Sequence, residues 1–220
     1  MQYAPTAPNY SHRPAFIMKV MGYVAFAFAM MAVGTLLGPS VFPPDLGRGA
    51  FLGLGVFTMA LGFFAHKWTN LPKPFNFLVY ALFAFLTGLM VYPILFYAVA
   101  IGGSELVFTA LAVTVLLSLA AGVYALTTKR DLSGIGGFLM MALIGLILVG
   151  FLQFFFFNEL VELISAAVGV VLFSAFIAYD IQMIQRFPED RAMEAGISLY
   201  MSLFNLFISV LRLIMALNRR

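Results

Sequence analysis

Residues 163–186 read LISAAVGVVLFSAFIAYDIQMIQR. The stretch opens with 17 consecutive uncharged, mostly apolar residues (163–179), reaches Asp180, and becomes apolar again at Ile181, Met183 and Ile184. A helix needs about 20 mostly apolar residues to cross the hydrocarbon core of a bilayer. An acidic side chain within such a helix is costly and marks a functional site by default. We therefore ask how many such helices the chain contains, and what holds Asp180.

The composition places the chain in a membrane. It has 220 residues, of which 63% are hydrophobic and 10% charged, and its mean hydropathy is +1.04. An average soluble domain carries about 25% charged residues, and a soluble fold could not keep this much apolar surface from water. Cysteine is absent, which excludes disulfides, thiolate metal sites and a cysteine nucleophile. The sequence predicts an all-α polytopic membrane protein whose first partner is the lipid bilayer.

Seven apolar segments are visible along the chain. They occupy 17–38, 49–65, 75–97, 105–126, 134–157, 160–180 or slightly beyond, and 195–217. Backbone groups must pair within the segment in lipid, so continuously apolar runs predict helices rather than open strands. The connections are short and carry proline or glycine, including Gly102 and Gly103. We predict one seven-helix transmembrane domain at 17–217, with a flexible tail at 1–16 and a short tail at 218–220.

Lysine and arginine predict the orientation. The N-terminal tail and alternate connections hold Arg13, Lys19, Lys67, Lys73, Lys129, Arg130, Arg186 and Arg191, whereas the opposite side holds Arg48, Arg219 and Arg220. By the positive-inside rule the N-terminus is cytoplasmic. The terminal arginines conflict with an outside C-terminus, but seven crossings remain the preferred interpretation. Because the net charge of +3 lies in short loops beside apolar segments, it indicates orientation, and no nucleic-acid partner is expected.

Residues that could support catalysis are few. No HExxH, GxSxG or P-loop motif occurs, so we expect neither an enzyme nor a cofactor. Most acidic residues lie in loops or near helix starts, where Glu105, Glu159 and Glu162 favour the positive end of the helix dipole. Asp180 differs because it lies about two turns inside the cytoplasmic end if its helix continues to Phe187. It is either a functional acid or an interfacial residue, solvated by headgroups or paired with Arg186.

The last apolar segment supplies a polar stripe. In SLYMSLFNLFISVLRLI (198–214), one helical face carries Ser198, Ser202, Asn205 and Ser209, at spacings of four, three and four. Ser202 follows the predicted helix start at 195 by seven residues, and Asp180 precedes the predicted end at 187 by seven. The two helices are consecutive and antiparallel, so Asp180, Ser202 and Asn205 are predicted to form a cluster for pH sensing or ion passage. Arg212 lies about 15 Å beyond Ser202 along the same helix, and its side chain is expected to extend to the membrane interface on the far side.

Four stretches together resemble the transmembrane Bax inhibitor motif family. They are TGLMVYPILFYAVA (87–100), YALTTKRDLSGIGGFL (124–139), AYDIQMI (178–184) and SLYMSLFNLFISVLRL (198–213). The resemblance is strongest to the bacterial YccA-type members. It implies a seven-helix fold with the last helix central, in the inner membrane of a bacterial cell.

The resemblance implies two functions. YccA-type members are associated with the membrane-anchored ATP-dependent protease FtsH, which suggests a non-enzymatic modulator of that protease. Other family members are described as pH-sensitive calcium leak channels that use paired aspartates on the sixth and seventh helices. Asp180 matches the first aspartate, but Ser202 stands at the second position and serine cannot ionise. A calcium or cation leak through Asp180 is therefore the alternative, with Ca²⁺ as its partner.

Overall fold

The computed structural model describes residues 14–41 and 48–219. Of the tail predicted at 1–16, residues 1–13 lie outside these residues, whereas residues 14–16 form the start of α1; 42–47 and Arg220 also lie outside them. The elements are α1 (Pro14–Val41), α2 (Arg48–Phe63), α3 (Ala65–Trp68), α4 (Phe75–Thr127), η1 (Ser133–Ile135), α5 (Gly136–Phe155), α6 (Glu159–Ile184), η2 (Glu189–Arg191) and α7 (Ala192–Asn218). Every element in this part of the chain is helical, and five helices are long and apolar enough to span a membrane. The predicted all-α polytopic membrane fold is confirmed.

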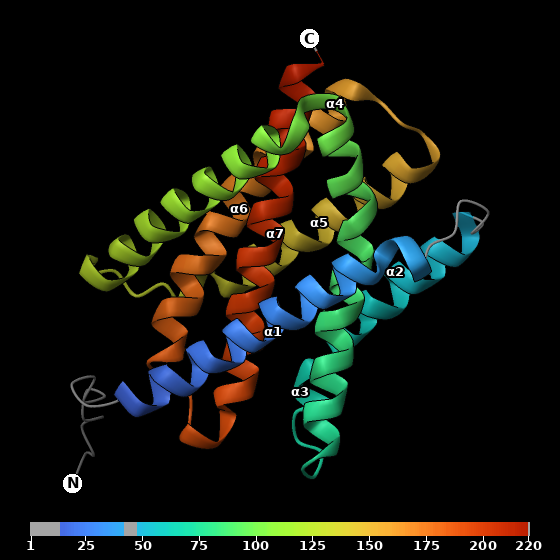
Figure 1. The fold of residues 1–220 in the computed structure, drawn as a ribbon. Coiled ribbons are helices and arrows are strands. Elements are labelled where there is room, and N and C mark those ends of the chain that lie inside the picture. Colours follow the sequence, from blue (N-terminus) through green and yellow to red (C-terminus); the bar gives the residue numbers. More distant parts are fainter. Residues whose placement is uncertain (1–13, 42–47, 220) are drawn as a thin grey trace, which may run out of the picture.

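Helix α4 combines two predicted segments. Its 53 residues correspond to about 80 Å at 1.5 Å per residue, which is more than twice the roughly 30 Å hydrocarbon core. The backbone leaves the helical conformation at Gly103, where φ is 67° and ψ is −177°. Figure 1 shows the first half running toward the C-terminal end of α7 and the second half returning. A positive φ of this size favours glycine, so the break predicted at Gly102 and Gly103 is confirmed.

Helix α2 is shorter than predicted. Its 16 residues correspond to about 24 Å, which is less than the roughly 30 Å of a typical hydrocarbon core. The apolar run predicted at 49–65 is interrupted because the chain turns at Phe64, after which α3 starts as a separate helix of four residues. The count of seven crossings therefore stays a prediction.

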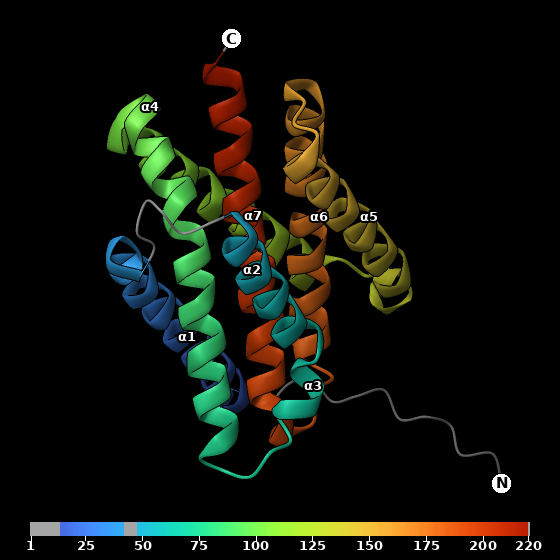
Figure 2. The same ribbon diagram turned by 90° about the vertical axis from the view of Figure 1, so that its right-hand side faces the viewer.

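Helix α7 is the centre of the bundle. In the most apolar 18-residue stretch of Glu189–Asn218, which contains α7, 50% of the residues are buried. In the corresponding stretch of Ser133–Phe155, which contains α5, only 6% are buried. Figure 2 shows α7 between α4 and α6, with α5 on the outer side of α6. The least exposed α7 side chains include Tyr200, Leu206 and Leu211. The central position implied for the last helix is confirmed, and it determines which residues can approach Asp180.

Helices α1 and α4 cross at a pair of glycines. A Cβ atom on Gly88 would collide with the backbone carbonyl of Met31, and one on Gly34 would collide with that of Phe85. The Thr35 hydroxyl donates across this crossing to the Gly88 carbonyl at 3.1 Å. In lipid, the hydrophobic effect does not drive helices together, so their association depends on close packing. Small residues allow this packing because they let the two backbones approach. This crossing anchors the N-terminal helix to the first half of α4.

Candidate functional site

Asp180 lies on the face of α6 that contacts α7. Its side chain is buried, with 3% of the residue exposed. Helix α6 ends at Ile184, so Asp180 lies about one turn from the end. The prediction of a helix reaching Phe187 is wrong, because Pro188 disfavours helical backbone in the residue before it. The carboxyl group is nevertheless removed from water, because α7 covers it.

Two serines of α7 bind the Asp180 carboxyl group. The Ser198 hydroxyl donates to Oδ1 at 2.7 Å, and the Ser202 hydroxyl donates to Oδ2 at 2.5 Å. The two serines are four residues apart, so they lie one above the other on the same helical face. Ser202 is buried, whereas Ser198 is exposed at the edge. We call Asp180, Ser198 and Ser202 the Asp180 cluster. A hydrogen bond to a charged group contributes about 1.5–3 kcal/mol, so the cluster fastens α7 to α6.

Asn205 lies outside this cluster. Its amide donates to the Met201 carbonyl in its own helix at 2.8 Å, and no hydrogen bond joins it to Asp180. The prediction of a three-residue cluster is therefore corrected: Ser198 takes the place expected for Asn205. The reason is geometric, because the helical spacing brings Ser198 and Ser202 to the two carboxyl oxygens and leaves Asn205 one turn deeper. Further along the same stripe, a Cβ atom on Gly169 would meet the Ser209 hydroxyl at 2.5 Å, so α6 and α7 also approach closely there.

Arg186, the predicted alternative partner of Asp180, forms an ion pair with Asp131 at 2.7 Å. Asp131 belongs to the connection between α4 and α5, outside the spans, and its side chain is largely exposed. The backbone N–H of Ser133, followed by the Arg186 side chain, lowers the pKa of Asp131 to about 2. Arg186 thus joins the end of α6 to the α4–α5 connection.

A second polar cluster lies at the other end of α6 and α7. Glu162 has 7% of its surface exposed, and its Oε2 accepts from Nη1 of Arg219 at 2.9 Å. Arg212 lies on its other oxygen, with Nε 4.0 Å from Oε1. The Arg219 guanidinium also stands over the Tyr97 ring at 5.3 Å. We call Glu162, Arg212 and Arg219 the Glu162 cluster.

Sequence reasoning missed the Glu162 cluster. Glu162 was assigned to the helix dipole, but the α6 N-terminus is capped by the Asn158 side chain, which accepts from two backbone N–H groups. Because α6 and α7 are antiparallel, the start of α6 lies beside the end of α7. The depth argument that paired Asp180 with Ser202 would also have paired Glu162 with Arg212 and Arg219.

The Asp180 cluster can exchange a proton or change its hydrogen bonds, and it offers few ligands to a cation. Ca²⁺ takes six to eight oxygen ligands, whereas this site brings one carboxylate and two hydroxyl oxygens together. Within 14–41 and 48–219, no group of three or more His, Cys, Asp or Glu residues is placed to hold a metal ion. What the geometry favours is a buried polar contact between two helices.

The fold and its buried polar contacts define a multi-pass, all-α membrane protein. The family model described as "Inhibitor of apoptosis-promoting Bax1" matches residues 13–220. The chain therefore belongs to the Bax inhibitor family, as its motifs predicted.

Relatives of the chain occur in bacteria, a mammal and a virus. An uncharacterized protein of Helicobacter pylori J99 is 30% identical over 202 residues, covering 91% of this chain and 86% of the relative. Protein lifeguard 4 of Mus musculus is 38% identical over 116 residues, 52% of this chain and 49% of the relative. The Golgi anti-apoptotic protein of Vaccinia virus (strain Lister) is 37% identical over 117 residues, 53% of this chain and 49% of the relative.

Proposed function

We propose that this protein is a non-enzymatic modulator of the membrane-anchored ATP-dependent protease FtsH. The observation that supports the proposal is the double attachment of α7. Its N-terminal part is bound to α6 by the Asp180 cluster and its C-terminal part by the Glu162 cluster. A protease that degrades a membrane protein must separate its helices, so a central helix fastened at both ends resists extraction. Such a protein could occupy the protease without being degraded rapidly.

The experiment reconstitutes the protein with the protease in liposomes and follows the degradation of a membrane substrate. We expect the unmodified protein to associate with the protease in mild detergent and to slow substrate turnover. The variant Ser198→Ala/Ser202→Ala leaves Asp180 buried without its two donors, so this variant should itself be degraded faster. The matched control is Ser118→Ala, because the Ser118 hydroxyl donates only within its own helix, to Thr114 at 2.7 Å. Absence of association, or unchanged substrate turnover, refutes the proposal.

A cation leak controlled by Asp180 is a second candidate. One observation favours it. Asp180 is only 3% exposed and lies in a helix apolar enough to span the membrane, and the hydrogen bonds to its carboxyl group come from two hydroxyl groups of α7. A change in its protonation would alter both hydrogen bonds and the contact between α6 and α7. Asn205 lies one turn deeper on α7 and would line the continuation of such a path.

Calcium flux into proteoliposomes at two pH values tests the leak. The expected result is a pH-dependent flux that Asp180→Asn changes and that the exposed-site control Asp131→Asn leaves unaltered. If no flux is measured, or if Asp180→Asn conducts like the unmodified protein, Asp180 has no part in conduction.

For localisation, the proposal is the inner membrane of a bacterial cell with a cytoplasmic N-terminus. Its support is the distribution of lysine and arginine over alternate connections. In Figure 1, the start of α1, the turn between α3 and α4, and the α6–α7 connection gather at one end of the bundle, away from the C-terminus of α7. A reporter fused to each terminus and assayed for cytoplasmic activity tests this orientation.

A further inference from the structure

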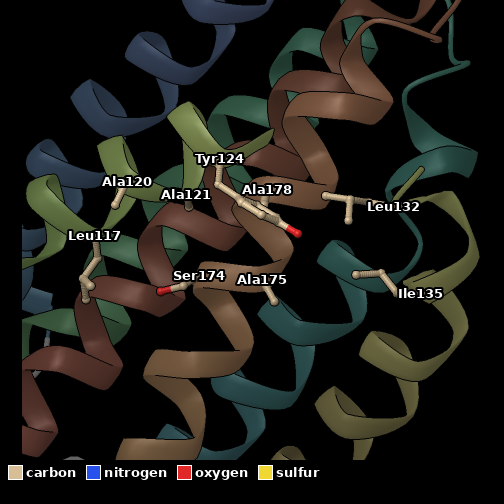
Figure 3. A pocket seen from close by; sticks show the side chains of 9 residues that line it. All are labelled: Leu117, Ala120, Ala121, Tyr124, Leu132, Ile135, Ser174, Ala175 and Ala178. Atoms are coloured by element: carbon tan, nitrogen blue, oxygen red, sulfur yellow. The ribbon is translucent and has the colours of Figure 1, made fainter. Parts of the chain in front are cut away.

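A cavity of about 430 Å³ lies between the second half of α4, the α4–α5 connection and α6. Figure 3 shows the side chains around it, which are Leu117, Ala120, Ala121, Tyr124, Leu132, Ile135, Ser174, Ala175 and Ala178. Ala178 and Asp180 are two positions apart, which is about 200° around a helix of 3.6 residues per turn. The cavity therefore lies on the opposite face of α6 from the Asp180 cluster and is separate from it.

The cavity is suited to hydrocarbon. Four alanines leave the space open, and the Ser174 hydroxyl is engaged within its own helix, where it donates to Val170 at 2.8 Å. The Tyr124 hydroxyl is the one further polar side-chain group of this lining, and a bound water needs two to four polar partners, so the cavity does not favour ordered water. Beside it on α4, Leu116, Leu119 and Val123 are 61–66% exposed. These side chains form a lipid-facing surface, so the cavity opens toward the lipid.

One glutamine of α6 fixes the connection that covers one end of this cavity. Gln182 lies four residues after Ala178, on the same face of α6. Its Oε1 accepts from the Leu132 backbone N–H at 2.9 Å, and its Nε2 donates to the carbonyls of Ala125 at 3.2 Å and Arg130 at 3.1 Å. Leu132 is consequently buried against Ala125 and Ala178. The end of the cavity is thus a defined surface rather than a loose loop.

This fixed connection carries two exposed cations, Lys129 and Arg130. Neither forms an ion pair with any residue in the described part of the chain, whereas the neighbouring acid Asp131 is engaged by Arg186. The cavity wall includes Tyr124, whose phenol group extends toward the space between Ala178 and Leu132 (Figure 3). Tyrosine commonly lies at the boundary between headgroups and acyl chains. The site therefore combines a positive rim with an apolar interior.

We propose that the cavity binds one acyl chain of an anionic phospholipid, whose phosphate headgroup lies at Lys129 and Arg130. The cavity extends along α4 from Tyr124 to Leu117, about 10 Å at 1.5 Å per residue. That depth fits within one leaflet of a hydrocarbon core of about 30 Å. Basic pockets between transmembrane helices are established sites for anionic headgroups. Here the two cations would attract the negative phosphate headgroup, and the small alanine side chains would leave space for the acyl chain.

Native mass spectrometry of the delipidated protein in detergent tests the charge preference. Phosphatidylglycerol and phosphatidylcholine with identical acyl chains are added separately. We expect preferential retention of phosphatidylglycerol, reduced about fivefold for each cation removed in Lys129→Gln and Arg130→Gln. Lys73→Gln is the matched control, because Lys73 is an exposed cation in a different connection. Equal retention of the two lipids by the unmodified protein overturns the proposal.

Cavity-filling variants test the acyl-chain site. Ala175→Phe places a ring in the cavity. Ala120→Leu is a milder change at the exposed wall of the cavity, and it provides the test if Ala175→Phe does not fold. Both should lose bound phosphatidylglycerol, whereas Ala167→Phe, at an exposed α6 position outside the cavity, should retain it. Full retention by Ala120→Leu contradicts the proposal. A dimer that Ala120→Leu abolishes, with no lipid adduct, would assign the cavity to a second copy of the chain and also overturn it.

Discussion

Replacing Ser202 with aspartate places a second acid beside Asp180 and should strongly destabilise the bundle at neutral pH. The Ser202 hydroxyl is 2.5 Å from Oδ2 of Asp180, so a carboxylate at position 202 would lie directly against the first. Two unit charges 4 Å apart repel by about 4 kcal/mol at an effective dielectric constant of about 20. The lost hydrogen bond to Asp180 adds about 1.5–3 kcal/mol. The sum, about 6 kcal/mol, is comparable with the whole stability of many domains, roughly 5–15 kcal/mol.

The sign of the pH effect follows from proton sharing. Two adjacent carboxyl groups that share one proton attract each other, so acid should relieve the repulsion in Ser202→Asp. Thermal unfolding in detergent at pH 5 and pH 8 measures this. We expect Ser202→Asp to unfold at a much lower temperature at pH 8 than at pH 5.

Two further variants separate the added charge from the added size. Ser202→Asn has nearly the volume of aspartate without its charge, and Asp180→Asn/Ser202→Asp keeps one carboxylate of the pair. Both should be more stable at pH 8 than Ser202→Asp. The reasoning is refuted if Ser202→Asp and Ser202→Asn unfold at the same temperature at pH 8, or if the double variant is as unstable as Ser202→Asp.

The remaining predictions use the same unfolding measurement. Glu162→Gln leaves two arginines without their partner, but these are 26–29% exposed, so its cost should fall below the roughly 3–5 kcal/mol of a fully buried pair; no loss would contradict the Glu162 cluster. Gly88→Ala should cost about 1–3 kcal/mol because its methyl group meets a backbone carbonyl, whereas Gly137→Ala, which meets nothing within 4 Å, should be tolerated. The pKa of Asp131, about 2, means that its ion pair with Arg186 stabilises above the ordinary pKa of 3.8 and is lost only as the pH falls through about 2. Asp131→Asn should therefore lower the unfolding temperature at pH 5 and have a smaller effect as the pH approaches 2, whereas equal shifts at the two pH values would show that the Asp131 pKa is not lowered in this way.

The helices and the main contact of Asp180 could be predicted because both depend on local periodicity. Continuous apolar runs determine where helices form in lipid, and a spacing of four residues puts Ser198 and Ser202 on one face. Consecutive antiparallel helices then set their depth relative to Asp180. The exact partner oxygens were beyond this argument, because they depend on the position of each helix along its axis. Ser198 and Asn205 lie on the same face on either side of Ser202, so a displacement of about one turn exchanges one for the other, which is the error that occurred.

The contacts formed by connections could not be predicted in the same way. Gln182 binds backbone groups 50–57 residues away, and nothing in its neighbouring sequence indicates them. Such contacts arise only when α6 packs against the second half of α4 and the connection that follows it, so they follow from the packing rather than from the pattern of any one segment.

Because the backbone leaves the helical conformation at Gly103, the second half of α4 can change its angle as a rigid helix, and a small change of angle there displaces its far end by several ångströms. From Gly103 to Thr127 the helix has 24 further residues, about 36 Å at 1.5 Å per residue. A rotation of about 10° at this glycine would move the far end by about 6 Å, given that length. The displacement would carry Lys129 and Arg130 away from Gln182 and change the width of the cavity beside α6. A change of angle at Gly103 would thus change the lipid contact at the opposite end of this helix.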